Sequence, residues 1–154
     1  MIPWPLAELL PHAGDVILLD AVEHFDDDGI LAHATVRPGT PFSDEDGSLP
    51  AWVGVELMAQ AVAAYAGCRA RAKAQPVEMG FLLGTRKYEC TVERFPAGSA
   101  LTLRALRSLE DESGMGVFEC HLEGPGFSAQ ARLNVYRPPN AAQYLAHAQE
   151  TSND

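Results

Sequence analysis

One carboxylate lies inside an otherwise apolar segment of the chain. The stretch from Pro50 to Gly67 reads PAWVGVELMAQAVAAYAG, and its single charged residue is Glu56. Gln60 follows one helical turn later, so in a helix the two side chains share a face. An unpaired ionised carboxylate is costly to bury, so such a group is paired, held in its neutral form, or functional. The spacing alone leaves open a structural role, in which Glu56 bonds to a loop amide or faces a partner subunit.

The residues around Glu56 belong to the longest predicted element. A helix from Pro50 to just before Pro76 is apolar on nearly every side until residues 69–73, which predicts that most of it is buried. Shorter helices are expected at residues 4–10 and 141–147. Strands are predicted from β-branched residues or from alternating apolar and polar side chains at residues 16–25, 30–36, 77–90, 101–109, 116–123 and 127–136.

These elements predict a single domain of class α+β. A helix that is apolar on all sides needs cover from several directions. A curved antiparallel sheet wrapped around it, closed by a second subunit, provides that cover. We therefore expect a hotdog-like fold over residues 1–154, with a core at about residues 9–136 and a tail at about residues 138–154.

Composition excludes several classes of function. A net charge of −10 argues against nucleic acid as a partner. Glu56 interrupts the longest apolar run, and the N-terminus lacks the features of a signal peptide, so we expect a soluble cytoplasmic protein without membrane contact. The histidines show no metal-ligand spacing, so no metal is expected. Three widely spaced cysteines are expected to be free in a reducing compartment: Cys68, Cys90 and Cys120.

Three motifs in order carry a resemblance to a known family. Residues 10–20 read LPHAGDVILLD, residues 50–60 read PAWVGVELMAQ, and FLLG at residues 81–84 is followed by FPAG at residues 95–98. Together they resemble the hotdog-fold 3-hydroxyacyl-acyl-carrier-protein dehydratases over residues 9–136. The PAW…ELMAQ, FLLG and FPAG elements are similar, more closely, to the variant dehydratases of aryl polyene biosynthesis clusters.

The resemblance implies dehydration of (3R)-hydroxyacyl thioesters on acyl carrier protein to trans-2-enoyl thioesters, in fatty acid or polyene and polyketide-type biosynthesis. This reaction needs a base for the α-proton, an acid for the departing hydroxyl and a donor for the carbonyl oxygen. The resemblance gives Glu56 the role of the acid and implies no cofactor beyond the carrier's phosphopantetheine arm. N–H groups at the helix start are the expected oxyanion donors. The expected oxyanion and substrate-binding residues are Ala51, Trp52, Gly54, Gln60 and Phe81.

The chain departs from the family at the catalytic histidine. That histidine lies fourteen residues before the helix carboxylate, where this chain has Phe42. A histidine suits the base because its ordinary pKa lies nearest the working pH. We choose His12, in the matched PH motif, although the alternative that it caps the carbonyls of the first helix stays open. The other four histidines are expected at less suitable places. His24 and His33 lie in the predicted hairpin, His121 on a polar strand face and His147 in the tail.

An acidic chain that binds an acidic carrier protein needs a local basic patch. Ordinary solubilising charge is the alternative explanation for each candidate. The candidates for carrier docking are Arg69, Arg71, Lys73, Arg86 and Lys87.

Three hypotheses follow, and in the family that the sequence resembles the active site lies at the dimer boundary. The first is a dehydratase, acting as a homodimer or as a heterodimer with a related hotdog subunit, with Glu56 mostly buried and His12 across a substrate-sized gap. The second is a hotdog thioesterase, which would also use a helix carboxylate. The third is a non-catalytic subunit that partners a related dehydratase, and it is motivated by Phe42 at the histidine position.

Overall fold

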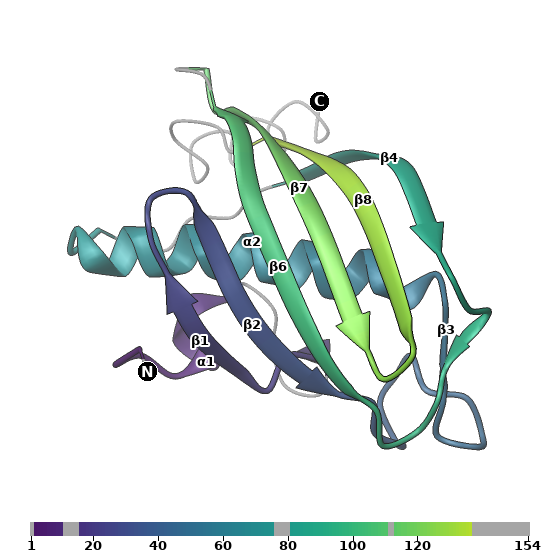
Figure 1. The fold of residues 1–154 in the computed structure, drawn as a ribbon. Helices are drawn as coiled ribbons and strands as arrows, with labels where there is room; N and C mark the ends of the chain where they lie inside the picture. The colour runs from purple at the N-terminus through teal and green to yellow at the C-terminus, as the bar shows by residue number, and fades with distance from the viewer. Residues whose placement is uncertain (1, 11–15, 76–80, 111–112, 137–154) are drawn as a thin grey trace, which may run out of the picture.

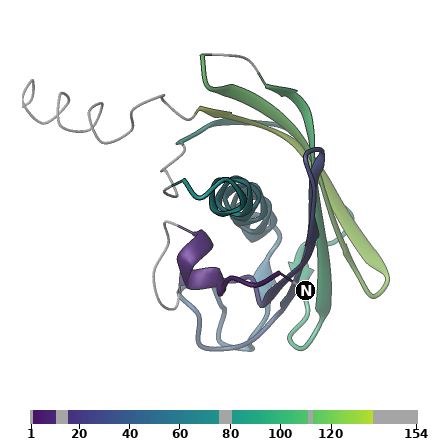
Figure 2. The same cartoon turned by 90° about the vertical axis from the view of Figure 1, so that its left-hand side faces the viewer.

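Six antiparallel strands form a curved sheet, and one long helix crosses its concave face (Figures 1 and 2). The computed structural model describes residues 2–10, 16–75, 81–110 and 113–136. The sheet order is β1-β2-β6-β7-β8-β4, and a two-stranded sheet pairs β3 with β5. This is the predicted hotdog fold. The elements are α1 (Leu6–Leu9), β1 (Ala21–Phe25), β2 (Gly29–Thr35), β3 (Leu49–Pro50), α2 (Val53–Ala72), β4 (Phe81–Cys90), β5 (Arg94–Phe95), β6 (Ala100–Glu110), β7 (Met115–Gly124) and β8 (Phe127–Tyr136).

The alternation of the strands decides which face of the sheet meets the helix. In β7 the side chains of Phe118, Cys120 and Leu122 are buried, whereas His121 and Glu123 are exposed on the opposite face. Strand β8 repeats this pattern, with its odd-numbered residues from Phe127 to Leu133 buried. The predicted division into one covered and one wet face is therefore confirmed for these strands.

Helix α2 is covered from two directions. The sheet lies on one side, and α1 packs on another, where a Cβ atom at Gly67 would come within 2.2 Å of the Leu9 carbonyl oxygen. Only glycine permits so close an approach of two backbones. A third strip of the helix, with Val55, Ala59 and Ala63, stays half-exposed. Within one chain, the apolar helix is thus covered on most of its surface but not on all of it.

Two predicted boundaries are wrong for physical reasons. The strand expected from residue 16 begins at Ala21, because the backbone of Val16 and Leu18 bonds to the Gln60 side chain instead of to a strand. Pro50 was expected in the first turn of the helix, but it lies in β3 opposite Arg94.

Two other predicted elements lie partly or wholly outside the described residues. The strand expected at 77–90 is described from Phe81 onward, and the helix expected at 141–147 is not described. Among the described helices, none is both long and apolar enough to cross a membrane.

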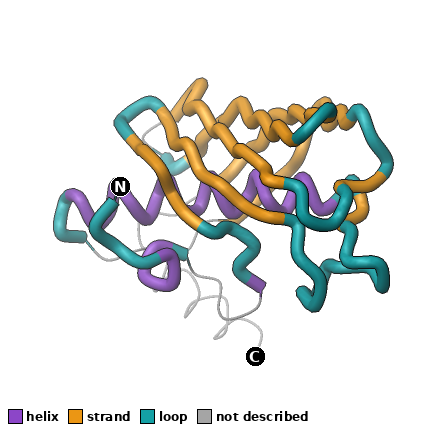
Figure 3. Tube along the Cα trace, turned by 60° about the horizontal axis from the view of Figure 1, so that its bottom comes forward, coloured by secondary structure: helices purple, strands orange, loops and turns teal. Residues whose placement is uncertain are grey.

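Loops gather at the N-terminal end of α2 (Figure 3). Arg94 in β5 anchors the loop before the helix, because its guanidinium pairs with Asp44 and its Nε donates to Ser48 Oγ at 3.2 Å. Phe95 is fully buried and stacks on Phe127, with ring centroids 5.3 Å apart. The phenylalanine of the FPAG motif therefore belongs to the hydrophobic core next to the start of α2.

Candidate active site

Three polar or aromatic side chains form one stripe along α2. Trp52, Glu56 and Gln60 are spaced four residues apart, so they lie on the same face of the helix. Trp52 is 61% exposed, Glu56 is half-buried and Gln60 is 0% exposed. The stripe thus runs from the surface at the helix start to the interior one turn beyond the carboxylate. Within one chain Glu56 is less buried than expected.

Gln60 uses both ends of its amide. Its Oε1 accepts from the Leu18 backbone N–H at 2.8 Å, and its Nε2 donates to the Val16 carbonyl oxygen at 2.8 Å and to Glu56 Oε1 at 3.1 Å. The two backbone partners settle which end of the amide is which, because an N–H only donates and a carbonyl only accepts. Glu56 Oε1 is therefore the acceptor of this hydrogen bond.

The segment that follows His12 is tied to this stripe. His12 itself lies outside the described residues, but both flanks are described: Leu10 is 5% exposed, and Val16 bonds to Gln60. Arg37 holds the same segment from the other side by donating to the Ile17 carbonyl oxygen at 3.1 Å.

The helix start offers fewer oxyanion donors than expected. The Ala51 N–H donates to the Glu93 carbonyl oxygen at 2.9 Å, and the Gly54 N–H donates to the Ala51 carbonyl oxygen at 3.0 Å. Among the described residues, none accepts from the N–H groups of Trp52 or Val53. One of these two N–H groups belongs to an exposed residue, Trp52, and the other to a residue that is 0% exposed, Val53.

Tyr88 is a site residue that the sequence analysis missed. Its hydroxyl donates to the Ala51 carbonyl oxygen in a short hydrogen bond, and a Cβ atom at Gly54 would come within 2.2 Å of that hydroxyl. Gly54 was expected to make room for a thioester, but this space holds Tyr88. Burial raises the pKa of the Tyr88 hydroxyl, with a smaller contribution from Cys90, so it remains a hydrogen-bond donor at neutral pH. An aromatic residue in a predicted strand was the only signal in the sequence.

Phe42, at the position of the family's histidine, packs near the helix start. Its ring meets the Trp52 ring edge-on, with centroids 6.2 Å apart and planes at 72°. Thr40 and Ser43 hold the turn around it through hydroxyls 2.6 Å apart. The loop that carries the base in related enzymes thus presents an aromatic pair here, with no titratable group at position 42.

The three described histidines do not reach Glu56. His24 pairs with Asp26 at 3.5 Å and His33 pairs with Glu23 at 3.4 Å, both at exposed sites of the β1–β2 hairpin. His121 is exposed on the outer face of β7. Helix α2 lies against the opposite face of this sheet, so none of the described histidines shares a site with Glu56.

The expected docking residues fall into two groups. Arg69, Arg71 and Lys73 lie at the C-terminal end of α2, about 20 Å along the helix from Glu56. The Arg69 guanidinium is engaged by Tyr65, whose ring centroid lies 5.5 Å away.

The second group lies at the other end of the helix. Arg86 and Lys87 are exposed on β4, directly before Tyr88. Phe81, expected at the substrate, begins β4, but the environment of its side chain is outside the described part of the structure.

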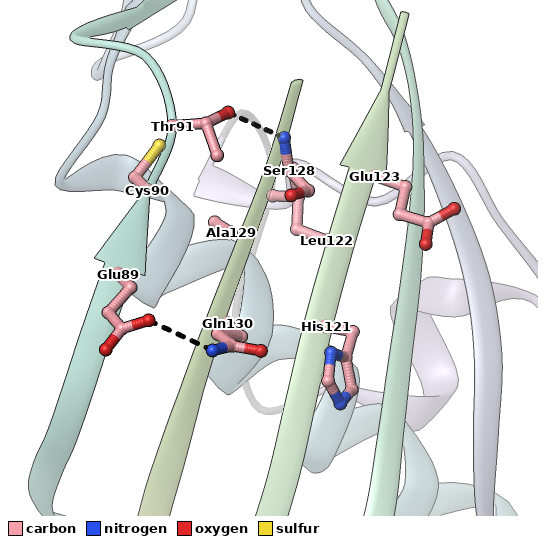
Figure 4. A pocket seen from close by; sticks show the side chains of 9 residues that line it. All are labelled: Glu89, Cys90, Thr91, His121, Leu122, Glu123, Ser128, Ala129 and Gln130. Atoms are coloured by element: carbon pink, nitrogen blue, oxygen red, sulfur yellow. Dashed lines mark hydrogen bonds between the residues drawn. The ribbon is translucent and has the colours of Figure 1, made fainter. Parts of the chain in front are cut away.

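A shallow hollow lies on the outer face of the sheet (Figure 4). Gln130 donates to Glu89 across it at 3.1 Å, and the Ser128 N–H donates to Thr91 Oγ1 at 3.0 Å. His121 and Glu123 point into the same region. This hollow is polar, and the sheet separates it from Glu56 and α2.

Comparison with known proteins places the chain in a family. A family profile described as ApeP dehydratase matches residues 4–146. A chain of the dehydratase heterocomplex ApeI:P from Xenorhabdus doucetiae is 32% identical, with a TM-score of 0.83 over 93% of this chain and 97% of that chain. No curated protein sequence matches.

More distant structures share the fold alone. The PaaI protein of the E. coli phenylacetic acid degradation operon is 14% identical, with a TM-score of 0.57 over 75% of this chain and 81% of that one. A hypothetical thioesterase from Streptococcus pneumoniae is 10% identical, with a TM-score of 0.58 over 76% of this chain and 84% of that one. The profile and the 32% identical structure agree, and they show that this chain belongs to the ApeP-like dehydratase family.

Proposed function

We propose that this chain dehydrates (3R)-hydroxyacyl thioesters on acyl carrier protein to trans-2-enoyl thioesters, with Glu56 as the general acid. The observation that carries this proposal is the buried Gln60, which orients Glu56 at the half-exposed face of α2. The carboxylate lies between the helix-start N–H groups and the anchored segment after His12. Membership of the ApeP-like dehydratase family supports the reaction class.

The roles follow from the bonds that must change. A base removes the proton from C2, the electron pair forms the C2=C3 bond, and Glu56 protonates the departing C3 hydroxyl, which leaves as water. The Trp52 N–H, at the exposed start of α2, stabilises the negative charge that develops on the thioester oxygen. Gln60 donates to Glu56 Oε1 and so orients the carboxyl group.

His12 is our candidate for the base. The described histidines lie on the far side of the sheet, and the chain that leads into and out of residues 11–15 is anchored by Leu10 and by the Val16–Gln60 bond. A partner subunit that supplies the histidine is the competing arrangement. The relative from Xenorhabdus doucetiae belongs to a dehydratase heterocomplex, and by analogy we propose an aryl polyene-type acyl chain as substrate and a second subunit as partner.

The test uses a 3-hydroxyacyl carrier thioester and purified protein, alone and with its partner subunit. Glu56→Gln should reduce enoyl formation by at least about 100-fold, since general acid catalysis contributes about 10²–10⁴. Glu123→Gln, on the outer face of the sheet, is the matched control and should keep wild-type turnover. Undiminished turnover in Glu56→Gln would refute the assignment, and release of free thiol would favour a thioesterase.

Phe42 favours one second candidate, a non-catalytic subunit that supports a related dehydratase. In that case the isolated chain is inactive, and activity appears only on mixing with the partner. The Glu56→Gln and His12→Ala variants of this chain would then leave the activity of the mixture unchanged. Loss of the mixture's activity in either variant would instead show that this chain contributes catalytic groups.

A further inference from the structure

The peptide group between Ala51 and Trp52 is held by its carbonyl oxygen. This oxygen, that of Ala51, accepts from the Gly54 N–H at 3.0 Å and from the Tyr88 hydroxyl. The N–H of the same peptide, that of Trp52, meets no acceptor in the described part of the chain. In a trans peptide the C=O and N–H point in opposite directions, and none of the described peptide bonds is cis. The contact with Tyr88 therefore turns the Trp52 N–H away from Tyr88.

An irregularity in β4 brings Tyr88 to this position. The register of β4 against β8 slips between Arg86 and Glu89, so the two residues between them lie opposite Ala131 alone. Such a β-bulge re-aims a side chain. Lys87, the first of the two residues, has a backbone φ of 55°, in the left-handed region that a lysine rarely adopts. Lys87 is exposed, whereas Tyr88 is half-buried and packs against the core, so the bulge turns Tyr88 toward α2.

Gly54 makes room for the Tyr88 hydroxyl at the helix start. A Cβ atom at Gly54 would come within 2.2 Å of that hydroxyl and within 3.1 Å of the ring carbon that carries it. The hydroxyl can thus reach the Ala51 carbonyl because the helix has no side chain at this position. Burial raises the pKa of the Tyr88 hydroxyl, so the group keeps its proton and stays a donor to this carbonyl.

We propose that Tyr88 is a positioning residue, one that aims and polarises the Trp52 N–H toward the thioester carbonyl. The proposal rests on the proposed function, in which this N–H stabilises the developing oxyanion. Hydrogen bonds in a chain strengthen one another, so a donor on the Ala51 carbonyl makes the N–H of the same peptide a better donor. Trp52 lies four residues before Glu56 on the same helical face, so the N–H and the carboxyl group can act on one substrate.

Tyr88→Phe tests the proposal, because it removes the hydroxyl and keeps the ring. With a 3-hydroxyacyl carrier thioester and the partner subunit present, kcat should fall about tenfold while KM changes by less than about twofold. Loss of an oxyanion donor costs about 10²–10³ in kcat, and loss of the group that positions the donor should cost less. The effect should appear in kcat because the contact strengthens as negative charge develops in the transition state.

Tyr65→Phe is the matched control. Tyr65 is 2% exposed, and its hydroxyl also donates to a backbone carbonyl oxygen, that of Asp27, at 2.6 Å. It lies about 14 Å along α2 from Glu56, so its hydroxyl is remote from the reaction. Tyr65→Phe should lower the melting temperature about as much as Tyr88→Phe but keep the wild-type kcat. Thermal melting of each variant establishes that it is folded.

A second readout needs binding but no turnover. The probe is butyryl-pantetheine with an isotope-labelled carbonyl carbon, which cannot be dehydrated because it has no hydroxyl group at C3. On binding to the wild-type complex, its carbonyl stretch in infrared difference spectra should move to lower frequency, because the Trp52 N–H polarises the C=O bond. The Tyr88→Phe complex should show a smaller shift, and the Tyr65→Phe complex should keep the wild-type shift.

Each outcome decides the proposal. A lower kcat and a smaller carbonyl shift in Tyr88→Phe alone support it. An unchanged kcat, a change confined to KM, or an equal loss in Tyr65→Phe overturns it, and so does a wild-type carbonyl band at the position of the free probe. If the wild-type complex does not dehydrate the carrier thioester, the proposed function fails, and the carbonyl shift still decides the role of Tyr88.

Discussion

Replacing Gln60 by leucine should destabilise the fold. The substitution keeps an apolar side chain of similar size in a position that is 0% exposed, but it removes three hydrogen bonds. The Leu18 N–H, in a residue that is 4% exposed, and the half-buried Val16 carbonyl lose their partners. An unsatisfied buried group costs about 1–3 kcal/mol, so we expect the free energy of unfolding to fall by about 2–4 kcal/mol.

Urea unfolding followed by circular dichroism measures this change. The typical stability of a domain, about 5–15 kcal/mol, leaves the variant folded. Gln130→Leu is the matched control, because Gln130 is exposed and donates one bond to Glu89, and its effect should stay within about 0.5 kcal/mol. A Gln60→Leu change below about 1 kcal/mol would refute the reasoning that these bonds anchor the segment before β1.

Three further predictions concern close contacts and thiols. Gly54→Ala should lower the free energy of unfolding by about 1–3 kcal/mol, because the new Cβ atom meets the Tyr88 hydroxyl. Adding Tyr88→Phe removes that hydroxyl and should recover part of the loss. If the Gly54→Ala variant is as stable as the wild type, the close contact between Gly54 and Tyr88 is contradicted. Gly67→Ala should be destabilising by a similar amount, measured in the same assay, since its Cβ atom meets backbone that moves less easily than a side chain. Burial raises the pKa of Cys120 to about 12, so the folded protein keeps a proton that the unfolded chain loses near pH 9. The free energy of unfolding should therefore fall as pH rises from about 9 toward 12, and Cys120→Ala should reduce this dependence on pH. The same pH dependence in both proteins would argue against a buried neutral thiol at Cys120.

Local patterns in the sequence predicted the elements that hold the site. Residues 53–72 are almost wholly apolar, and the helix forms there. The period of two in β7 and β8 predicted which of their side chains face it. Glu56 and Gln60 could be placed on one face because helical spacing is a local property. The three ordered motifs were enough to predict the family, which the profile match confirms.

The contacts around the site required the tertiary structure. Gln60 bonds to residues more than forty positions earlier, and Tyr88 reaches Ala51 from a strand edge. The pairing of β3 with β5 involves two residues on each side, too few to leave a periodic pattern. The base stays a prediction, because His12 lies outside the described residues.

The sequence by itself therefore determined the residue types at the candidate site. It has a carboxylate, Glu56, in an apolar helix, an amide, Gln60, one turn later, and an aromatic residue, Phe42, where the family has a histidine. Only the tertiary structure decided that the amide orients the carboxylate, that two of the expected oxyanion N–H groups are already bonded, and that β4 ends the sheet with a charged edge. The physical reason is that periodicity and turn chemistry depend on neighbours in sequence. Hydrogen bonds and strand order, in contrast, depend on which distant segments pack together.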